Sequence, residues 1–268
     1  MRTIAIINQK GGVGKTTTAV NLSAALADSG RRVCLVDLDP QAHASLHLGV
    51  VPDDHRPTIY DVLLGDAAFD EALQSVGERL HVLPSHLDLA AAELELAGEV
   101  GRELVLRDRL ATSLHVFDEL IIDCPPSLGV LTLNALCAVR EVFLPLQPHF
   151  LALHGLSKLL QTIEVVSRRL NADLRLSGII MCMYETGTRL AAEVSQDVES
   201  FVDSDEILQA PWANVRLFET RIRRNIRLAE APSFGQSIFE YAPSSAGADD
   251  YRMLVDEFLE TTAEFTLA

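Results

Sequence analysis

Nine residues near the start of the chain combine glycines, lysines and hydroxyl groups in an order suited to binding phosphate. They read Gln9-Lys10-Gly11-Gly12-Val13-Gly14-Lys15-Thr16-Thr17, after an apolar stretch at residues 3–7 and before an amphipathic stretch at residues 16–27. Glycines let backbone N–H groups approach phosphate oxygens, and a helix start adds the positive end of its dipole. Lys15 would place a charge on the β- and γ-phosphates, and the Thr16 hydroxyl would complete a magnesium shell. The alternative is an ordinary glycine-rich turn, which the order of strand, glycines, Lys-Thr and helix disfavours.

This loop departs from the pattern G-x-x-x-x-G-K-[ST], because position 9 is glutamine and Lys10 is an additional lysine. In this form it resembles the deviant Walker A motif of the ParA/MinD ATPases, the class that includes Soj. The resemblance implies that Lys10 reaches across a nucleotide-sandwich dimer to the partner's phosphates, where it could supply the charge that an arginine finger supplies in other NTPases. The alternative is that Lys10 is a solvated loop lysine. The residues expected to bind ATP are Lys10, Gly11, Gly12, Val13, Gly14, Lys15, Thr16 and Thr17.

Two carboxylates follow the second predicted strand, which spans residues 32–37. Asp37 and Asp39 should lie near the phosphates, because ligands of doubly wound folds collect at the carboxyl ends of the strands. The family carries the same Asp-Pro-Gln run, which implies that Asp39 positions the attacking water or the waters of magnesium. Alternatively, the two acids belong to a strand-end turn that caps a helix. The family usually continues with Gly-Asn, whereas this chain has Ala42-His43.

A third acid, Asp123, ends the apolar stretch at residues 117–123. This is the form of a Walker B acid, which holds a magnesium-bound water. The Pro-Pro-Ser run after it matches a switch loop of the family, so the resemblance places Asp123 on the magnesium side together with Thr16 and Asp39. It also places Met183, near the end of the apolar run 176–184, against the adenine, although Met183 could equally be a core residue.

One concentrated basic stretch lies at residues 212–228, with five arginines and a single acid, Glu219, in a chain of net charge −16. The family has an Ile-Pro-Arg-Asn-Val-Arg-Leu pattern here, and arginine replaces its proline at position 223. The resemblance implies non-specific DNA binding by an ATP-bound dimer, and arginine suits phosphate contacts. Alternatively, some of these side chains pair with acids or line the adenine pocket. The candidate DNA-binding residues are Arg221, Arg223, Arg224 and Arg227.

Composition narrows the other possibilities. The strongly negative net charge limits any nucleic-acid contact to a local patch. Four scattered cysteines without metal-ligand spacing indicate buried, reduced thiols in a cytosol. We expect neither a signal peptide nor an N-terminal DNA-binding domain, because the first predicted strand follows Met1 at once. An acidic helix at residues 249–265 differs from the basic membrane-binding tail of MinD relatives, so the ParA/Soj branch is favoured.

The predicted fold is α/β, with a doubly wound, mainly parallel sheet, helices on both faces and a single domain over residues 1–268. Further strands are expected at residues 80–84 and 141–146. Helices are expected at residues 16–27, 58–64, 87–96, 101–110 and 188–201, with another ending at Leu170. His149 and His154 stand where the family has glutamates. If they face a partner, dimerisation should depend on pH near neutrality.

We therefore expect a cytoplasmic, nucleoid-associated ATPase of chromosome or plasmid partitioning that uses ATP and Mg²⁺ and does not bind membranes. ATP would form a homodimer that binds duplex DNA, and a ParB-like partner with a basic segment would stimulate hydrolysis and release. One rival is the same ATPase positioning a protein cluster or microcompartment. Others are a metabolic enzyme of the deviant P-loop class, such as a dethiobiotin-synthetase-like ligase or a nitrogenase-type reductase, and a nucleotide-binding module without turnover.

Overall fold

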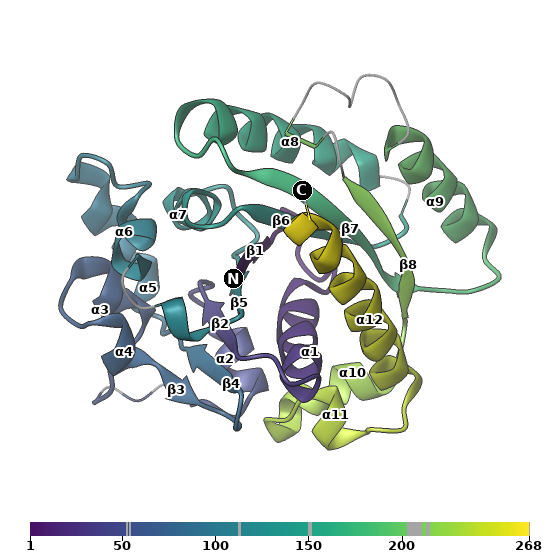
Figure 1. The fold of residues 1–268 in the computed structure, drawn as a ribbon, viewed down its shortest axis with the longest axis horizontal. Coiled ribbons are helices and arrows are strands. Elements are labelled where there is room, and N and C mark those ends of the chain that lie inside the picture. The colour runs from purple at the N-terminus through teal and green to yellow at the C-terminus, as the bar shows by residue number, and fades with distance from the viewer. Residues whose placement is uncertain are drawn as a thin grey trace.

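The computed structural model describes residues 1–51, 53, 55–111, 114–149, 152–202, 211–212 and 215–267. Within this part of the chain, eight strands form one sheet in the order β3-β4-β2-β5-β1-β6-β7-β8 (Figure 1). Neighbouring strands are parallel except for the short pair of β3 with β4, so the predicted mainly parallel, doubly wound sheet is confirmed. The strands are β1 Arg2–Ile6, β2 Val33–Asp37, β3 Gln74–Ser75, β4 Leu80–Leu83, β5 Glu119–Asp123, β6 Glu141–Leu146, β7 Arg175–Tyr184 and β8 Arg216–Arg223.

Helices cover both faces of the sheet, because each central strand buries apolar side chains on both sides. In and just after β1, Ala5 and Ile7 contribute to one core, and Ile4 and Ile6 contribute to the other. The first face is covered by α3 Ile59–Leu64, α4 Phe69–Ala72, α5 Leu89–Glu95, α6 Val105–Leu110, α7 Val130–Ala138, α8 Ala152–Arg169 and α9 Arg189–Val202. The second is covered by α1 Lys15–Asp28, α2 His43–His47, α10 Ile226–Glu230, α11 Ile238–Tyr241 and α12 Ala246–Leu267.

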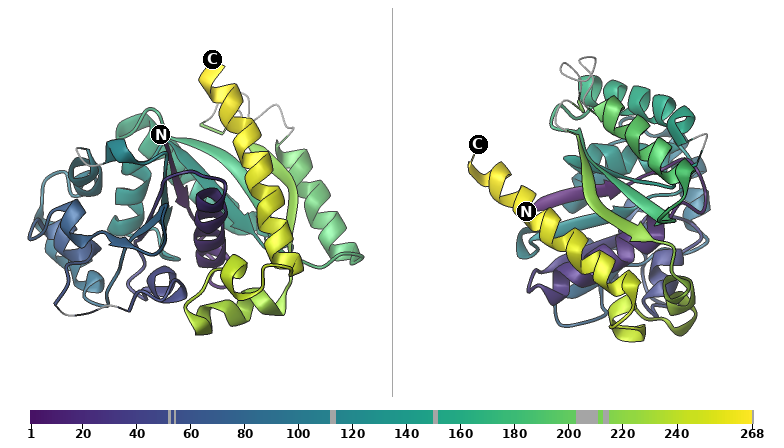
Figure 2. Two further views of the ribbon diagram at one scale, coloured as in Figure 1. Left: turned by 60° about the horizontal axis from the view of Figure 1, so that its bottom comes forward. Right: turned by 90° about the vertical axis from the view of Figure 1, so that its right-hand side faces the viewer.

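The helix α12 packs along α1 and β8, as both views of Figure 2 show. Within the described residues, no helix has the length and apolar character needed to cross a membrane. All four cysteines are buried and free, as the sequence predicted.

Strand β8 was not predicted, because its arginines conceal the apolar alternation. Phe218, Thr220 and Ile222 are buried, whereas Glu219 between them is exposed. An edge strand tolerates charges on its solvent side, so half of its positions carry no apolar signal. The helix expected at residues 101–110 is also shorter than predicted, since α6 begins only at Val105 and Gly101 lies in the preceding turn at φ 76°.

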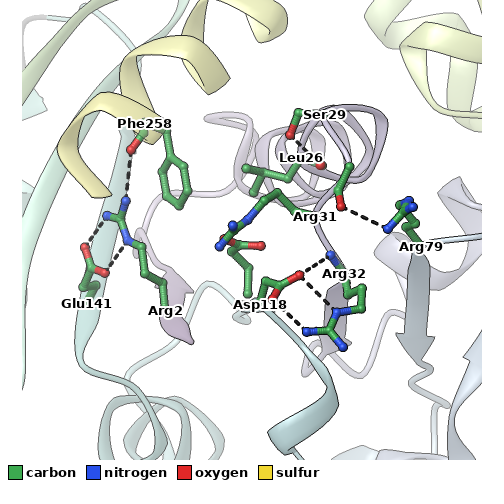
Figure 3. A network of polar contacts seen from close by, with 11 residues as sticks. Arg2, Leu26, Ser29, Arg31, Arg32, Arg79, Asp118, Glu141 and Phe258 are labelled. Carbon is green, nitrogen blue, oxygen red and sulfur yellow. Dashed lines mark hydrogen bonds and ion pairs between the residues drawn. The ribbon is translucent and has the colours of Figure 1, made fainter. Parts of the chain in front are cut away.

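Ion pairs join the strands at their amino ends, the edge of the sheet opposite the candidate site (Figure 3). Arg2 at the start of β1 pairs with Glu141 of β6 at 2.6 Å and donates a hydrogen bond to the carbonyl of Phe258 in α12 at 3.1 Å. Arg32 pairs with Asp118 before β5 at 3.0 Å. These contacts tie β1, β6 and α12 together at this edge, and they leave the carboxyl ends of the strands to the loops that carry the predicted chemistry.

Candidate nucleotide-binding site

The glycine-rich loop connects β1 to α1, as the sequence indicated, and two of its glycines need their lack of a side chain. Gly12 has φ 73° and Gly14 has φ 98°, in the left-handed region that residues with a Cβ atom rarely adopt. Gly14 is the N-cap residue of α1. The loop therefore brings its backbone to the N-terminus of a helix of 14 residues, where the helix dipole favours an anion.

Lys15 is buried beneath this loop, with 7% of its surface exposed. Its Nζ donates a hydrogen bond to the carbonyl oxygen of Lys10 at 3.3 Å. Burial lowers the pKa of Lys15, and the carboxylates of Asp123 and Asp39 oppose that shift. The structure thus brings together one lysine and two acids that lie far apart in the sequence.

Asp123 at the end of β5 is fully buried. Neither of its carboxylate oxygens makes a hydrogen bond of normal geometry with the described residues. Burial raises the pKa of Asp123 well above its ordinary value, the charge of Asp37 raises it further, and Thr16 and Lys15 oppose the shift. A buried carboxylate without partners is costly, and a divalent cation or its bound water removes that cost. The residues present therefore fit Mg²⁺.

Asp37 and Asp39 have different surroundings. Asp37 is fully buried and accepts hydrogen bonds from the N–H of Ser45 at 2.8 Å and its hydroxyl at 2.7 Å. Burial raises its pKa above the ordinary carboxyl range. These contacts of Asp37 hold α2 against the end of β2. They agree with the alternative in which Asp37 belongs to a strand-end turn that caps a helix. Asp39 lies beyond the strand, and one of its oxygens accepts a bond from the N–H of Gln41 at 3.0 Å.

Ala42, where the family usually has glycine, adopts the left-handed conformation that glycine would favour. Its φ is 53°, and it is the N-cap residue of α2. A side chain in this region costs about 1–2 kcal/mol. The segment between Asp39 and α2 is therefore strained at its first turn.

A cavity of about 490 Å³ opens beside the glycine-rich loop. Met183 lines it with φ 51° and 36% exposure, so Met183 is not the core residue that the alternative interpretation required. Tyr251 of α12 lines the same cavity, and its hydroxyl lies 3.2 Å from that of Thr18 in α1. The other lining residues include Gly14, Thr17, Gln147, Cys182, Ile222, Arg224, Asn225, Ile226 and Leu228.

Sequence reasoning missed the contributions of Asn8 and Tyr251. Asn8 lies two residues after the end of β1, accepts a hydrogen bond from the N–H of Lys10 at 2.9 Å and donates one to the carbonyl of Pro145 at 2.8 Å. Its position between a strand and the loop was a usable signal. The contact of Tyr251 joins residues 233 positions apart, and no local pattern marks it. Lys10 itself is exposed at the surface of the loop.

The four candidate DNA-binding arginines all pair with carboxylates, and their partners lie on different elements of the fold. Arg221 faces Glu199 of α9 at 3.6 Å, and Arg223 pairs with Asp250 of α12 at 2.6 Å. Arg224 pairs with Glu185 at 2.9 Å and Arg227 with Glu230 at 2.7 Å; their side chains are 76% and 53% exposed. Arg223 and Arg224 also line the cavity. Arg224 and Arg227 are thus the most accessible of the four.

The two histidines that replace family glutamates are only partly placed. His149 is exposed. The side chain of His154 lies outside the described residues. Their role at a dimer face remains a prediction.

Comparison with known proteins places this site in a family. Residues 1–176 match the protein family described as an AAA domain. The sequence is 44% identical to the chromosome partitioning protein ParA of Myxococcus xanthus, over 97% of this chain and 88% of the relative. It is 43% identical to the sporulation initiation inhibitor protein Soj of Bacillus subtilis, over 95% of this chain and 96% of the relative.

Solved structures share the fold. The cobyrinic acid a,c-diamide synthase of Mycobacterium smegmatis, solved with bound ADP and magnesium, matches with a TM-score of 0.81 and 39% identity. The match covers 96% of this chain and 94% of that one. Because the family match spans well over half of the sequence and the curated relatives match nearly all of it, the chain belongs to the ParA/MinD family of ATPases, as a relative of the chromosome-partitioning proteins ParA and Soj.

Proposed function

We propose that this protein is a Mg²⁺-dependent ATPase of chromosome or plasmid partitioning, whose ATP-bound dimer binds duplex DNA without sequence specificity. The observation that carries the proposal is the cluster of Lys15, Asp39 and Asp123, whose buried carboxylate oxygens accept no hydrogen bond of normal geometry from the described residues, under the glycine-rich loop that carries the exposed Lys10. A buried carboxylate without partners next to a phosphate-binding loop is explained by a cation that arrives with its nucleotide.

Each residue of the cluster has a distinct role. The backbone of residues 11–14 and the start of α1 bind phosphate oxygens, and Lys15 places its charge on the β- and γ-phosphates. Thr16 and Asp123 would hold Mg²⁺, which when bound would supply positive charge to neutralise the phosphates. Asp39 orients the attacking water, and Met183 packs against the adenine. The pKa of Lys15 is lowered because burial removes water from its ammonium group. The negative charge of a bound phosphate would raise that pKa again.

Dimerisation follows from Lys10. Its side chain is exposed on the loop, and in the proposed dimer it contacts the phosphates bound by the second subunit. The γ-phosphate would then strengthen the contact between subunits, so nucleotide state would control pairing. Pairing doubles the number of accessible arginines on one particle, and each added phosphate contact strengthens DNA binding and makes it more sensitive to salt.

The proposed partner is a ParB-like protein with a basic segment that speeds hydrolysis. The support is the net charge of −16, which favours encounter with a basic peptide through long-range attraction. A DNA-bound dimer that hydrolyses its ATP would then return to monomers and leave the nucleoid.

The test is the size of the protein with ADP, ATP or a non-hydrolysable ATP analogue, with and without duplex DNA. Phosphate release is measured in parallel. We expect monomers with ADP, dimers with ATP or the analogue, and DNA binding only by the dimer. A monomer under every condition contradicts the proposal. DNA binding of equal affinity with ADP and with ATP contradicts it as well. Nucleotide binding without any phosphate release, with or without DNA, would support the module without turnover.

One further candidate is a biosynthetic ligase of the same fold. It is favoured by the 39% identity to the structure named as a cobyrinic acid a,c-diamide synthase. Phosphate release stimulated by cobyrinic acid and a nitrogen donor, with no response to DNA, would support it. If the ATPase instead positions a protein cluster, it should dimerise and bind DNA in the same way. The partner recovered with it in a pull-down should then differ from a ParB-like protein.

A further inference from the structure

Two glycines that lie far apart in the sequence, Gly49 and Gly235, are in backbone contact with each other. Gly49 follows α2, and Gly235 follows a 3₁₀ turn at Ala231–Phe234. Both are left-handed, at φ 71° and 64°. A Cβ atom at Gly235 would lie 2.9 Å from the Cα of Gly49, and one at Gly49 would lie 3.1 Å from the carbonyl oxygen of Gly235. Neither position has room for a side chain unless the two backbones move apart.

The Gly49 side of this contact leads to Asp39. The segment between them contains the strained Ala42 and the short helix α2. Ser45 of α2 is bonded to the buried Asp37, and the N–H of Val50 donates to the carbonyl of Ser45 at 3.0 Å. The segment is therefore a compact unit, fixed at one end to β2 and in contact with Gly235 at the other.

The Gly235 side leads to the arginines. Phe234 stacks on Tyr241 with ring centroids 4.9 Å apart, and the Tyr241 hydroxyl donates to Glu230 at 3.0 Å. Glu230 holds Arg227 at 2.7 Å. In the other direction, α10 contributes Leu228 to the cavity beside the glycine-rich loop. The segment 226–241 thus carries the exposed Arg227, and it contacts the Asp39 segment through Gly235 and lines the cavity through Leu228.

We propose that the Gly49–Gly235 contact couples the Asp39 segment to α10, so that these two glycines are positioning residues for Arg227, one of the candidate DNA-binding arginines. The inference rests on the proposed function, because it assigns a route by which nucleotide at Asp39 controls Arg227. A contact between two backbones has no flexible side chain to absorb a displacement, so a shift of one segment moves the other.

The experiment replaces each glycine by alanine and compares DNA binding with the ATP analogue and with ADP. Gly235→Ala forces the segments apart at the closest approach, and Gly49→Ala is the milder change. Gly101→Ala is the matched control, because Gly101 has a similar φ of 76° but nothing within 4 Å of its added methyl group. All three variants carry comparable backbone strain, and only two of them disturb the contact.

We expect the ratio of DNA affinities with analogue and ADP to fall at least tenfold in Gly235→Ala and Gly49→Ala. Nucleotide affinity should change less than threefold, and Gly101→Ala should keep the wild-type ratio. An unchanged ratio in both contact variants overturns the inference, and so does an equal loss in Gly101→Ala. A wild-type protein without any nucleotide-dependent DNA binding refutes the proposed function instead.

A readout without DNA tests the coupling independently. Hydrogen exchange of the wild type should change in both segments, 39–50 and 226–241, when the ATP analogue binds. In Gly235→Ala the response should remain at 39–50 and disappear at 226–241. If both segments still respond in this variant, the contact does not transmit the signal, whatever happens to DNA affinity.

Discussion

The buried Nζ of Lys15 lies 3.3 Å from the carbonyl oxygen of Lys10, so one lysine of the loop holds the backbone that carries the other. The first ammonium group faces inward toward Asp123 and Asp39, and the second side chain stays at the surface. In the proposed function, the same loop binds phosphate within its own subunit through Lys15 and offers the charge of Lys10 to a second subunit. Nucleotide binding and pairing should accordingly respond differently to a change at Lys10.

Lys10→Ala should abolish ATP-driven dimerisation and reduce turnover at least 100-fold, while ATP affinity falls less than tenfold. The reason is that an arginine-finger-like charge supplied by a partner acts on the transition state and on the contact between subunits. Light scattering after size exclusion gives the mass, and a fluorescent nucleotide gives the affinity. Lys158→Ala is the control, because it removes an exposed lysine from α8. Wild-type pairing in Lys10→Ala would contradict the role assigned to this lysine.

Asp123→Asn should stabilise the metal-free protein at pH 7, because the neutral amide of asparagine avoids the cost of burying a charged carboxylate. The folded state raises the pKa of Asp123, so it binds the proton more tightly than the unfolded chain. The free energy of unfolding of the wild type therefore falls as the pH rises from the ordinary carboxyl pKa of 3.8 through the raised value.

With Mg²⁺ and ADP bound, the wild type should instead be more stable than Asp123→Asn, because the cation stabilises the ionised carboxylate more than the neutral amide of asparagine. Denaturant unfolding from pH 4 to 8, with and without Mg²⁺ and ADP, measures both effects. Asp173→Asn removes an exposed carboxylate and is the control. A destabilised metal-free Asp123→Asn variant would show that this carboxylate has a partner of its own.

Ala42→Gly should raise the free energy of unfolding by about 0.5–1 kcal/mol. It removes left-handed strain of about 1–2 kcal/mol and increases the entropy of the unfolded chain by a smaller amount. Ala90→Gly, at an exposed position of α5, should lower the free energy of unfolding by about 0.5–1 kcal/mol. Thermal unfolding of the two variants beside the wild type measures the difference in sign. Equal destabilisation by both would mean that Ala42 is relaxed in solution.

Arg224→Glu with Arg227→Glu should weaken analogue-dependent DNA binding at least tenfold and lower its salt slope by about 2, one for each phosphate that the variant no longer neutralises. Folding should be almost unchanged, because exposed ion pairs contribute only about 0–1 kcal/mol each. Titrations of duplex DNA at several salt concentrations give both quantities. Arg189→Glu is the control, an exposed arginine of α9 paired with Glu193. Retention of full DNA affinity in the double variant would remove these two residues from the interface.

Arg223→Ala should instead lower stability by about 1–3 kcal/mol, because it leaves the carboxylate of Asp250, 5% exposed, without its charged partner. Unfolding by denaturant measures this loss. Arg224→Ala is the matched control, because it removes an arginine from an ion pair that is exposed to solvent. If Arg223→Ala weakens DNA binding without changing stability, its contact with Asp250 opens when DNA binds.

The sequence alone determined the local framework of this protein. The alternation of side chains along a strand makes the strands recognisable, together with the acids at their ends. Backbone sterics explain why glycines stand at positions 12 and 14. These local features predicted the parallel sheet, the loop and the positions of Asp39 and Asp123 along the chain.

The tertiary structure decided which of these groups meet and in what state. The burial of Asp123 and Lys15, the pairing of Arg223 with Asp250 and the contact of Gly49 with Gly235 all involve distant segments. Burial and electrostatic interaction depend on distances in space, which local propensity does not encode. The arginines show this most clearly, because one basic run in the sequence is divided between an edge strand and the residues after it, and each arginine pairs with a different carboxylate.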